Sequence, residues 1–486
     1  MGSASGGLML AAIMPINRIL SLNPTGHKPF LDAATRDLGV PPAIADLVSQ
    51  LLAPAHSARP TLDHVIQVLD RDHAIEAPTN SSPEPNAEEL TTACDSMASY
   101  IRSVMSIDRQ DRLFPSAPEV FTTNPLSVAF GAAGVLCALK ASGVNDTEAV
   151  EWLLRRPITP ATYPPGLYVG LSGIAWTLLE LDRPADAQRI LRLADGHPLL
   201  DTSPDVFYGL AGWGLTQLKF FLATGDEYYL DQARSAGERL LGLAAAVDGE
   251  CSYVSQGATS TGFGHGVAGI AVFFLYLFCA TGDERFLTRG TECMAFAYAR
   301  VRRTRDGAWT WRAREGEPAM TPYWRWGTAG VGMAALRYDV LTGDEQHRVF
   351  AERALTDVHR KFTIFPGRFF GLAGLGEYCL DLEAFGVCAD AAKTALATIV
   401  DGISLFKLER PGGVCFPGET LARISCDFGT GSAGILAFMC RVLHRQRALY
   451  MLDELLLNSD SMNRAPQAES TVRTGLCGPT SIAAHR

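Results

Sequence analysis

The sequence predicts an all-α fold, an α/α toroid of seven inner and seven outer helices with a small N-terminal helical appendage. The first observation behind this prediction is a G-x-x-G phrase that recurs seven times, each time before an apolar helical run. The second is the phrase T-G-D-E, which begins 12 residues after the last glycine of three copies. The copies begin at Gly131, Gly170, Gly209, Gly266, Gly327, Gly371 and Gly431.

Four stretches of different composition divide the chain. Residues 1–76 are interpreted as a separate helical piece. Residues 77–89, A-P-T-N-S-S-P-E-P-N-A-E-E, are interpreted as a linker because they lack apolar periodicity. The repeats occupy residues 90–457. Residues 458–486 are polar and show no period, which predicts a frayed tail.

Each repeat is predicted to be a helical hairpin. A first helix starts near the G-x-x-G phrase and runs for roughly 18 Å. The glycine of T-G-D-E supplies the left-handed residue that ends this helix, and the aspartate caps the next one. The first helix is apolar on nearly all sides, as in Gly266–Cys279, and is therefore expected to be the inner one. The second helix, such as Asp283–Arg300, has a polar face and is expected outside.

The repeats are predicted to close into a ring rather than to stack as an open solenoid. Their first glycines are 39 to 61 residues apart, whereas solenoid repeats are usually more uniform. Inner helices that are apolar all round also favour closure. Insertions before the fourth, fifth and seventh copies contain residues typical of β-strands, such as Cys251-Ser-Tyr-Val and Trp309-Thr-Trp-Arg. These insertions are expected at one mouth of the ring.

The paired glycines admit two interpretations. Residues three apart lie on one face of a helix, so the glycines leave a smooth backbone that permits close packing. The same positions expose backbone N–H groups at helix N-termini, which favour anions. Convergence of seven such phrases at one end of a ring favours a site there.

Composition excludes several functional classes. The chain of 486 residues is 47% hydrophobic and 19% charged, as in a well-buried globular protein. A net charge of −10 argues against nucleic acid as a partner. The longest apolar stretch, Val267–Ala280, is too short to span a membrane, and no cleavable signal opens the chain, so a cytoplasmic location is expected. The 11 cysteines include no C-x-x-C pair and are expected to be reduced.

The G-x-x-G phrases at the heads of inner helices resemble those of the lanthionine synthetase C-like cyclases. The resemblance covers residues 90–457, about three quarters of the chain. It implies a seven-fold α/α toroid and a carbon–sulfur bond-forming enzyme. Members of that family add cysteine thiols of a ribosomal precursor peptide to dehydroalanine or dehydrobutyrine, which forms lanthionine or labionin thioether rings.

Two polar residues match the catalytic phrases of this family. Asp205 lies four residues before Gly209, and His265 lies immediately before Gly266. The resemblance implies that they are catalytic, and both are expected at one mouth as an acid/base pair. Considered alone, an aspartate before a helix is usually a cap and a histidine beside an apolar helix is usually structural.

The family's zinc ligands are replaced in this sequence. Zinc-using relatives carry a cysteine where the phrase Trp324-Arg325-Trp326-Gly327 has Arg325. They carry Cys-His before the next repeat's glycine, where this sequence has Phe369-Phe370. Guanidinium and phenyl groups cannot replace thiolate and imidazole as zinc ligands. No metal and no cofactor are therefore expected. This departure resembles the class III branch, in which one polypeptide joins a lyase, a kinase and a zinc-free cyclase.

The N-terminal piece is similar to the last helices of a protein-kinase C-lobe. The similarity lies in residues 40–61, which end with the phrase Arg59-Pro60-Thr61. No glycine-rich loop, H-R-D or D-F-G occurs, so kinase activity is not expected from this chain. The implied partners are the precursor peptide and the kinase and lyase domains of a parent synthetase, with neither nucleic acid nor membrane.

Three functional hypotheses follow from the sequence. In a cyclase, Asp205 and His265 handle proton transfer and Arg325 stabilises thiolate or enolate charge. In a non-catalytic binding platform, an aromatic lining holds the precursor peptide. That lining consists of Trp324, Trp326, Phe369 and Phe370. In an α/α-barrel glycosidase, paired carboxylates would be required, and only Asp205 stands out at the helix heads.

Overall fold

The computed structural model describes residues 22–457 except for 24–25, 54, 72–81, 248–249, 306, 315 and 318–319. The predicted tail 458–486 lies outside the described residues, as do parts of the predicted segments 1–76 and 77–89. The described part is mostly helical, and none of its helices is long and apolar enough to cross a membrane.

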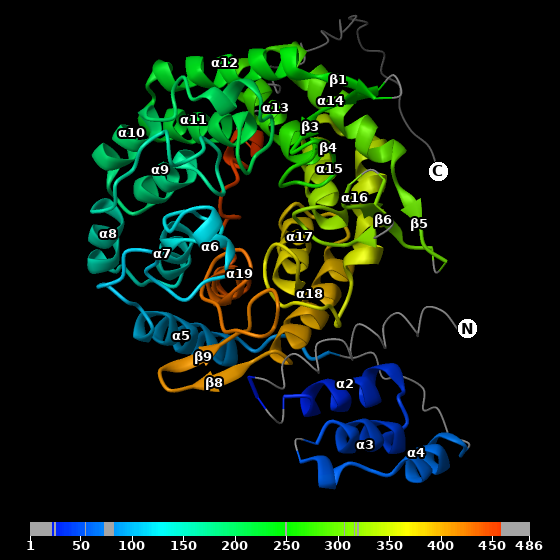
Figure 1. Ribbon diagram of the computed structural model, residues 1–486. Helices are drawn as coiled ribbons and strands as arrows, with labels where there is room; N and C mark the ends of the chain where they lie inside the picture. The colour runs from blue at the N-terminus through cyan, green and yellow to red at the C-terminus, as the bar shows by residue number, and fades with distance from the viewer. Residues whose placement is uncertain are drawn as a thin grey trace, which may run out of the picture.

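Seven inner helices form a closed ring (Figure 1). They are α7 (Ala132–Ala141), α9 (Leu171–Glu180), α11 (Leu210–Thr224), α13 (Val267–Thr281), α15 (Thr328–Thr342), α17 (Leu372–Ala384) and α19 (Ser432–His444). Each contacts the next, and α19 returns to contact α7. Their side chains are buried on nearly all sides, which confirms the predicted toroid.

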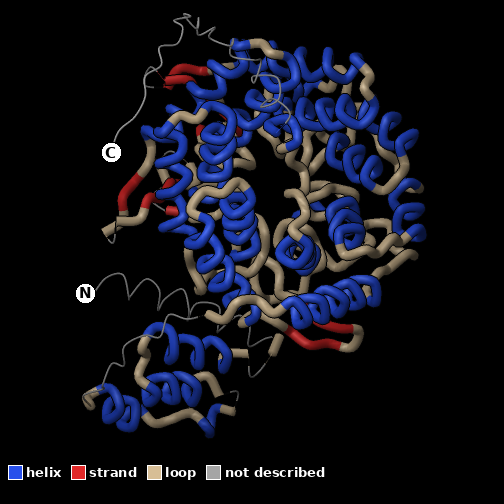
Figure 2. Tube along the Cα trace, turned by 180° about the vertical axis from the view of Figure 1, so that it is seen from behind, coloured by secondary structure: helices blue, strands red, loops and turns tan. Residues whose placement is uncertain are grey.

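The outer layer contains one helix for each inner helix. Six of them follow their inner partners in sequence: α8 (Thr147–Leu154), α10 (Pro184–Arg192), α12 (Glu227–Leu243), α14 (Glu284–Ala299), α16 (Glu345–Val358) and α18 (Ala389–Ser404). The seventh is α5 (Ala87–Ser103), which precedes the first repeat and packs against α19 (Figure 2). The start of the repeat region therefore supplies the outer helix of the last repeat.

Helix α5 also corrects a predicted boundary. It begins at Ala87, inside the stretch 77–89 that was expected to be a linker. The side chain of Asn86 accepts a hydrogen bond from the backbone N–H of Glu88 at 2.9 Å, which starts the helix there.

The T-G-D-E phrases act as predicted. Gly225, Gly282 and Gly343 have φ values of 69°, 70° and 66° and end α11, α13 and α15. The aspartate that follows each glycine accepts a hydrogen bond from the backbone N–H two residues later, which caps the outer helix. These caps set the length of three hairpins.

The glycines of G-x-x-G allow a short loop to fold over the head of each inner helix. A Cβ on Gly269 would lie 2.1 Å from the carbonyl oxygen of Phe263, and one on Gly173 would lie 1.8 Å from that of Leu167. The second glycine of every other copy meets the same obstacle, a carbonyl six residues earlier. Close packing therefore explains the motif.

The expectation that these helix heads offer N–H groups to anions is wrong for most copies. The first-turn N–H groups already donate to carbonyls of their own head loops. The N–H of Val267 bonds to Ser260 O at 3.0 Å, and that of Leu210 bonds to Ser203 O at 2.8 Å. Because the loop folds back, it satisfies the donors that a bare helix N-terminus would leave open.

The head loops are joined by a circle of backbone hydrogen bonds around the ring axis. The residues involved lie two positions, or in one case one position, before the first glycine of a G-x-x-G phrase. In each step the backbone N–H of one such residue donates to the carbonyl oxygen of the corresponding residue in the next repeat. The steps are Ala129→Tyr168, Val169→Phe207, Phe207→Gly264, Gly264→Arg325, Arg325→Phe369, Phe369→Gly429 and Gly429→Ala129, at 2.7–3.4 Å. This circle holds residues from consecutive repeats side by side.

The insertions form short antiparallel strands, as their sequence suggested. Two hairpins precede the fourth repeat, a three-stranded sheet precedes the fifth and one hairpin precedes the seventh. The strands are β1 (Ala245–Val247), β2 (Glu250–Ser252), β3 (Val254–Ser255), β4 (Ala258–Thr259), β5 (Arg302–Arg303), β6 (Trp309–Arg312), β7 (Met320–Thr321), β8 (Leu408–Arg410) and β9 (Gly413–Cys415).

A small N-terminal unit packs on the outside of the ring near α18. It consists of α2 (Lys28–Leu38), α3 (Pro42–Leu51) and α4 (Leu62–Leu69). Phe30 meets Phe406 edge to face at 4.9 Å between ring centroids. Lys361 of the ring pairs with Asp37 of α2 and with Asp401 of α18. The unit is thus attached to the toroid by an apolar contact and an ion pair.

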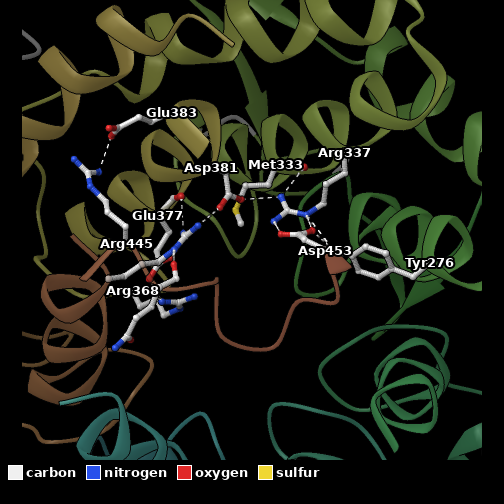
Figure 3. A network of polar contacts seen from close by, with 11 residues as sticks. Tyr276, Met333, Arg337, Arg368, Glu377, Asp381, Glu383, Arg445 and Asp453 are labelled. Carbon is white, nitrogen blue, oxygen red and sulfur yellow. Dashed lines mark hydrogen bonds and ion pairs between the residues drawn. The ribbon is translucent and has the colours of Figure 1, made fainter. Parts of the chain in front are cut away.

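The last described segment, residues 448–457, lies inside the ring and is held there by an ion network (Figure 3). Arg337 donates to both carboxylate oxygens of Asp453 at 2.7 Å and to Asp381 at 2.7 Å. Arg441 links Asp381 to Glu377, which also pairs with Arg368. Tyr450 packs against Tyr168 at 5.8 Å between ring centroids. The segment therefore contacts inner helices and head loops from within the ring.

Candidate active site

Asp205 and His265 meet at the head of the ring. His265 Nδ1 lies 2.8 Å from Asp205 Oδ2, and the two side chains are almost completely buried. Asp205 also accepts from the backbone N–H of Tyr208 at 2.7 Å and from the hydroxyl of Ser255 at 2.5 Å. Asp205 is therefore both a loop cap and the partner of an imidazole.

Arg325 completes a chain of three side chains. Its Nε and Nη2 atoms lie 3.0 and 2.9 Å from His265 Nε2. The backbone circle explains this contact, because Gly264 and Arg325 are hydrogen-bonded neighbours in it. Arg325 is only half-buried, so it is the member of the chain that reaches solvent.

The contacts define the state of the imidazole. A guanidinium can only donate, so His265 Nε2 accepts and Nδ1 carries the proton that is donated to Asp205. Burial lowers the pKa of His265; Asp205 opposes this and Arg325 adds to it. The imidazole is therefore neutral at pH 7. Burial also lowers the pKa of Arg325 to about 10, which leaves the guanidinium charged.

Aromatic rings enclose this chain. Trp326 stacks on His265 at 4.3 Å between ring centroids, and Phe207 lies on its other side at 4.4 Å. The Arg325 guanidinium lies 4.3 Å from the Phe207 ring centroid and 5.3 Å from that of Phe370. Such rings exclude water and strengthen the electrostatic contacts between the polar groups.

The four aromatic residues that the sequence nominated as a peptide lining fall into two pairs. Trp324 and Phe369 stack on each other and are 2% and 0% exposed, so they belong to the packed centre of the ring. Trp326 and Phe370 are half-buried next to Arg325. These two can face a substrate.

The residues at the family's zinc positions do not fit zinc. Arg325 places a charged guanidinium next to His265 Nε2, and the Phe369 and Phe370 rings offer no lone pair. Within the described residues, no three His, Cys, Asp or Glu side chains are grouped so that they could hold a metal ion.

Sequence reasoning missed Ser255 and Glu419. Ser255 comes from an insertion hairpin and holds Asp205, but no spacing or phrase in the sequence singles it out. Glu419 lies on the loop after β9 and contributes, with Glu119, an electrostatic attraction to Arg325. Burial and Glu119 raise the pKa of Glu419. Both residues come to the site through tertiary structure alone.

Comparisons with known proteins identify relatives. A family model described as "Lanthionine synthetase C-like protein" matches residues 185–457. A protein of Streptomyces coelicolor described as "Probable SapB synthase" is 32% identical over 353 residues, which cover 72% of this chain and 37% of that protein. This chain thus matches little more than a third of the length of that relative.

Among solved structures, nisin cyclase has a similar fold. It superposes with a TM-score of 0.51 at 18% identity, and the match covers 70% of this chain and 94% of the cyclase. At that identity the similarity concerns the fold.

Proposed function

Because this chain belongs to the lanthionine synthetase C-like family, we propose that it is a lanthipeptide cyclase. It adds cysteine thiols of a ribosomal precursor peptide to dehydroalanine or dehydrobutyrine and forms lanthionine or labionin rings. The observation that carries this proposal is the hydrogen-bonded chain Asp205–His265–Arg325 at the head of the ring.

The first chemical step is removal of the thiol proton. His265 is neutral, and its Nε2 lone pair is directed toward the half-buried Arg325. A substrate thiol that takes the place of the guanidinium donor delivers its proton to Nε2. Asp205 stabilises the imidazolium that results and keeps the ring in one orientation. Asp205 therefore acts through His265, because it is itself completely buried.

The second step forms the carbon–sulfur bond. The thiolate sulfur attacks the β-carbon of the dehydro residue, and the π electrons move to the carbonyl oxygen as an enolate. Arg325 stabilises this negative charge. The imidazolium of His265 then returns the proton to the α-carbon. The peptide gains and loses no atoms, so ring closure leaves its mass unchanged.

The proposed reaction does not use zinc. A zinc ion lowers the pKa of a bound thiol, and Arg325 is proposed to provide the positive charge for this purpose instead. The class III assignment rests on the same substitution of Arg325 and Phe369-Phe370 for the usual ligands. Purified protein that holds one zinc ion per chain would contradict this part of the proposal.

The test is a thiol count by mass spectrometry. The chain is incubated with a dehydrated precursor peptide, and the thiols that remain are alkylated. Loss of alkylatable thiol at unchanged peptide mass, faster than without protein, supports the cyclase. Unchanged thiols together with measurable peptide binding would instead support a non-catalytic platform, which the half-buried Trp326 and Phe370 favour as the second candidate.

We also propose that further domains of a parent synthetase contact the N-terminal unit. Helix α4 exposes Leu62, Ile66 and Leu69 on one face, at 72%, 47% and 57% of their surface. Such a face usually packs against an apolar partner. The kinase-like interpretation of residues 1–76 offers one, namely the remainder of a kinase C-lobe beside a lyase domain. The 11 cysteines include no C-x-x-C pair and are scattered through a large chain, which supports a reducing, cytoplasmic setting.

A further inference from the structure

A cleft on the outer side of the ring holds a thiol and a guanidinium in direct contact. Cys251 lies on β2, in the insertion before the fourth repeat, and Arg289 lies on the outer helix α14. Arg289 Nη1 donates a hydrogen bond to Cys251 Sγ at 3.3 Å. The cleft measures about 410 Å³, and its walls include Ala244, Glu250 and Phe296. A small reagent can therefore reach the sulfur of Cys251.

A second thiol lies behind the first. Cys293 follows Arg289 by four residues on α14, so both side chains leave the helix on the same face. Cys293 is fully buried on the helix against which β2 packs, and the two thiols influence each other's pKa. The cleft thus contains one accessible sulfur and one cation, which also pairs with Glu292, and a buried thiol lies one helical turn from that cation on α14.

The charges around Cys251 favour the thiolate. The neighbouring thiol of Cys293 and the contact with Arg289 lower the pKa of Cys251 to about 6, although burial and Glu292 act in the opposite direction. Burial keeps the pKa of Cys293 well above its usual value. Thiolates at low-pKa, accessible positions beside a second thiol are the ones that peroxides oxidise.

We propose that Cys251 and Cys293 form a redox-sensitive pair that hydroperoxides convert into a disulfide. The Cys251 thiolate attacks one peroxide oxygen, the O–O bond breaks, and the leaving oxygen departs as water or alcohol after it is protonated. The sulfenic acid of Cys251 then accepts the sulfur of Cys293, which loses its proton, and a second water leaves. The two thiols lose two electrons, and the peroxide gains them.

This pair lies on the chain segment that supports the candidate active site. Ser255, which holds Asp205, follows Cys251 by four residues. Tyr253, between them, is anchored to the Leu240 carbonyl oxygen at 3.0 Å. Oxidation would therefore bond the segment that carries Cys251 and Ser255 covalently to α14, and this same segment positions Asp205. The inference does not depend on the proposed cyclase activity, because its test reads thiol chemistry alone.

The test compares thiols within the intact chain at pH 7. Limiting iodoacetamide followed by peptide mass spectrometry is expected to label Cys251 about tenfold faster than Cys388. Cys388 is the matched control because it is more exposed, while burial and Glu352 raise its pKa. Arg289→Gln is expected to slow the labelling of Cys251 and to leave that of Cys388 unchanged.

Hydrogen peroxide is then expected to yield one cross-linked peptide pair, which contains Cys251 and Cys293 and is lighter by two hydrogens. With Cys293→Ser, oxidation stops at a sulfenic acid on Cys251 that dimedone traps. Cys94 and Cys440 also influence each other's pKa, but both residues are buried, and this pair is expected to stay reduced. Faster labelling of Cys388, or peroxide treatment without the Cys251–Cys293 cross-link, would overturn the proposal.

Discussion

Asp427 is a counterpart of Asp205, and comparing the two separates loop capping from orientation of His265. Asp427 also lies four residues before a first glycine, is also completely buried and also accepts a hydrogen bond from the N–H three residues later, at 2.6 Å. It contacts Ser425, Thr430 and Ala117 and, among the residues that the structure describes, no imidazole. Loop capping is thus common to both aspartates, and orientation of His265 belongs to Asp205 alone.

We expect Asp205→Asn to reduce kcat for ring formation about 10²-fold or more, because the imidazole loses the carboxylate that stabilises its charged form. Asp427→Asn is the control, since it perturbs an equivalent loop at equal burial. It is expected to retain kcat while it lowers the thermal midpoint by a similar amount. Equal losses of activity in both variants would reduce Asp205 to a structural cap.

The pH dependence of kcat/KM is expected to respond in opposite directions to the two partners of His265. The reaction needs the neutral imidazole, so the rate falls as pH drops through a pKa below about 6.5. Arg325 lowers this pKa and Asp205 raises it. Arg325→Gln therefore moves the acidic limb to higher pH, and Asp205→Asn moves it to lower pH. If the acidic limb of the kcat/KM profile lies at the same pH in the wild type and in both variants, a group other than His265 titrates.

At this scale the sequence singled out polar residues that the structure places in contact, and their catalytic role stays a prediction. Asp205, His265 and Arg325 each lie in a recognisable head phrase, and the structure joins all three. Ser255 carries no signal because its role depends on how an insertion folds back. Trp324 and Phe369 were nominated as lining, but alternate residues of a head loop point into the ring centre, and sequence alone does not say which.

At the scale of single elements, the G-x-x-G head is a packing device. The loop passes so close to the first helical turn that its carbonyls occupy the space of a Cβ. The loop then bonds to the first-turn N–H groups. Sequence periodicity predicted the helices, their caps and their order. It could not predict that first-turn N–H groups of most helix heads are already bonded, because this depends on the path of the preceding loop.

We expect Gly269→Ala to lower the free energy of unfolding by about 3 kcal/mol, since its Cβ would lie 2.1 Å from the carbonyl oxygen of Phe263. Gly242→Ala in α12 is the matched control, because nothing lies within 4 Å of its Cβ, and it is expected to be neutral or to stabilise by up to about 1 kcal/mol. Denaturant unfolding measures both. Equal effects would show that the close approach is not what selects glycine.

For the whole molecule, closure uses both ends of the repeat region. Helix α5 supplies the last outer helix, and residues 448–457 contact inner helices from within the ring through Asp453. The repeats alone implied that every inner helix is followed by its own outer helix. That the seventh outer helix precedes the first repeat could not be read from the sequence, because α5 carries no G-x-x-G phrase.

Asp453→Ala is expected to destabilise the protein by about 3 kcal/mol, because it leaves the buried guanidinium of Arg337 with only part of its compensating charge. Glu151→Ala removes a surface ion pair with Arg183 and is expected to cost at most about 1 kcal/mol. Thermal unfolding compares the two variants. A loss for Asp453→Ala no larger than that of the surface control would show that the central segment is not clamped by this ion pair.

The most direct test of the account is the rate of ring formation on a dehydrated peptide, followed by thiol alkylation after the protein has been treated with a metal chelator. Chelated wild-type protein is expected to keep its full rate, and chelated His265→Ala is expected to be about 10²–10⁴-fold slower. Loss of the wild-type rate on chelation with recovery on added zinc, or an unchanged rate in His265→Ala, would contradict a metal-free cyclase that works through Asp205, His265 and Arg325.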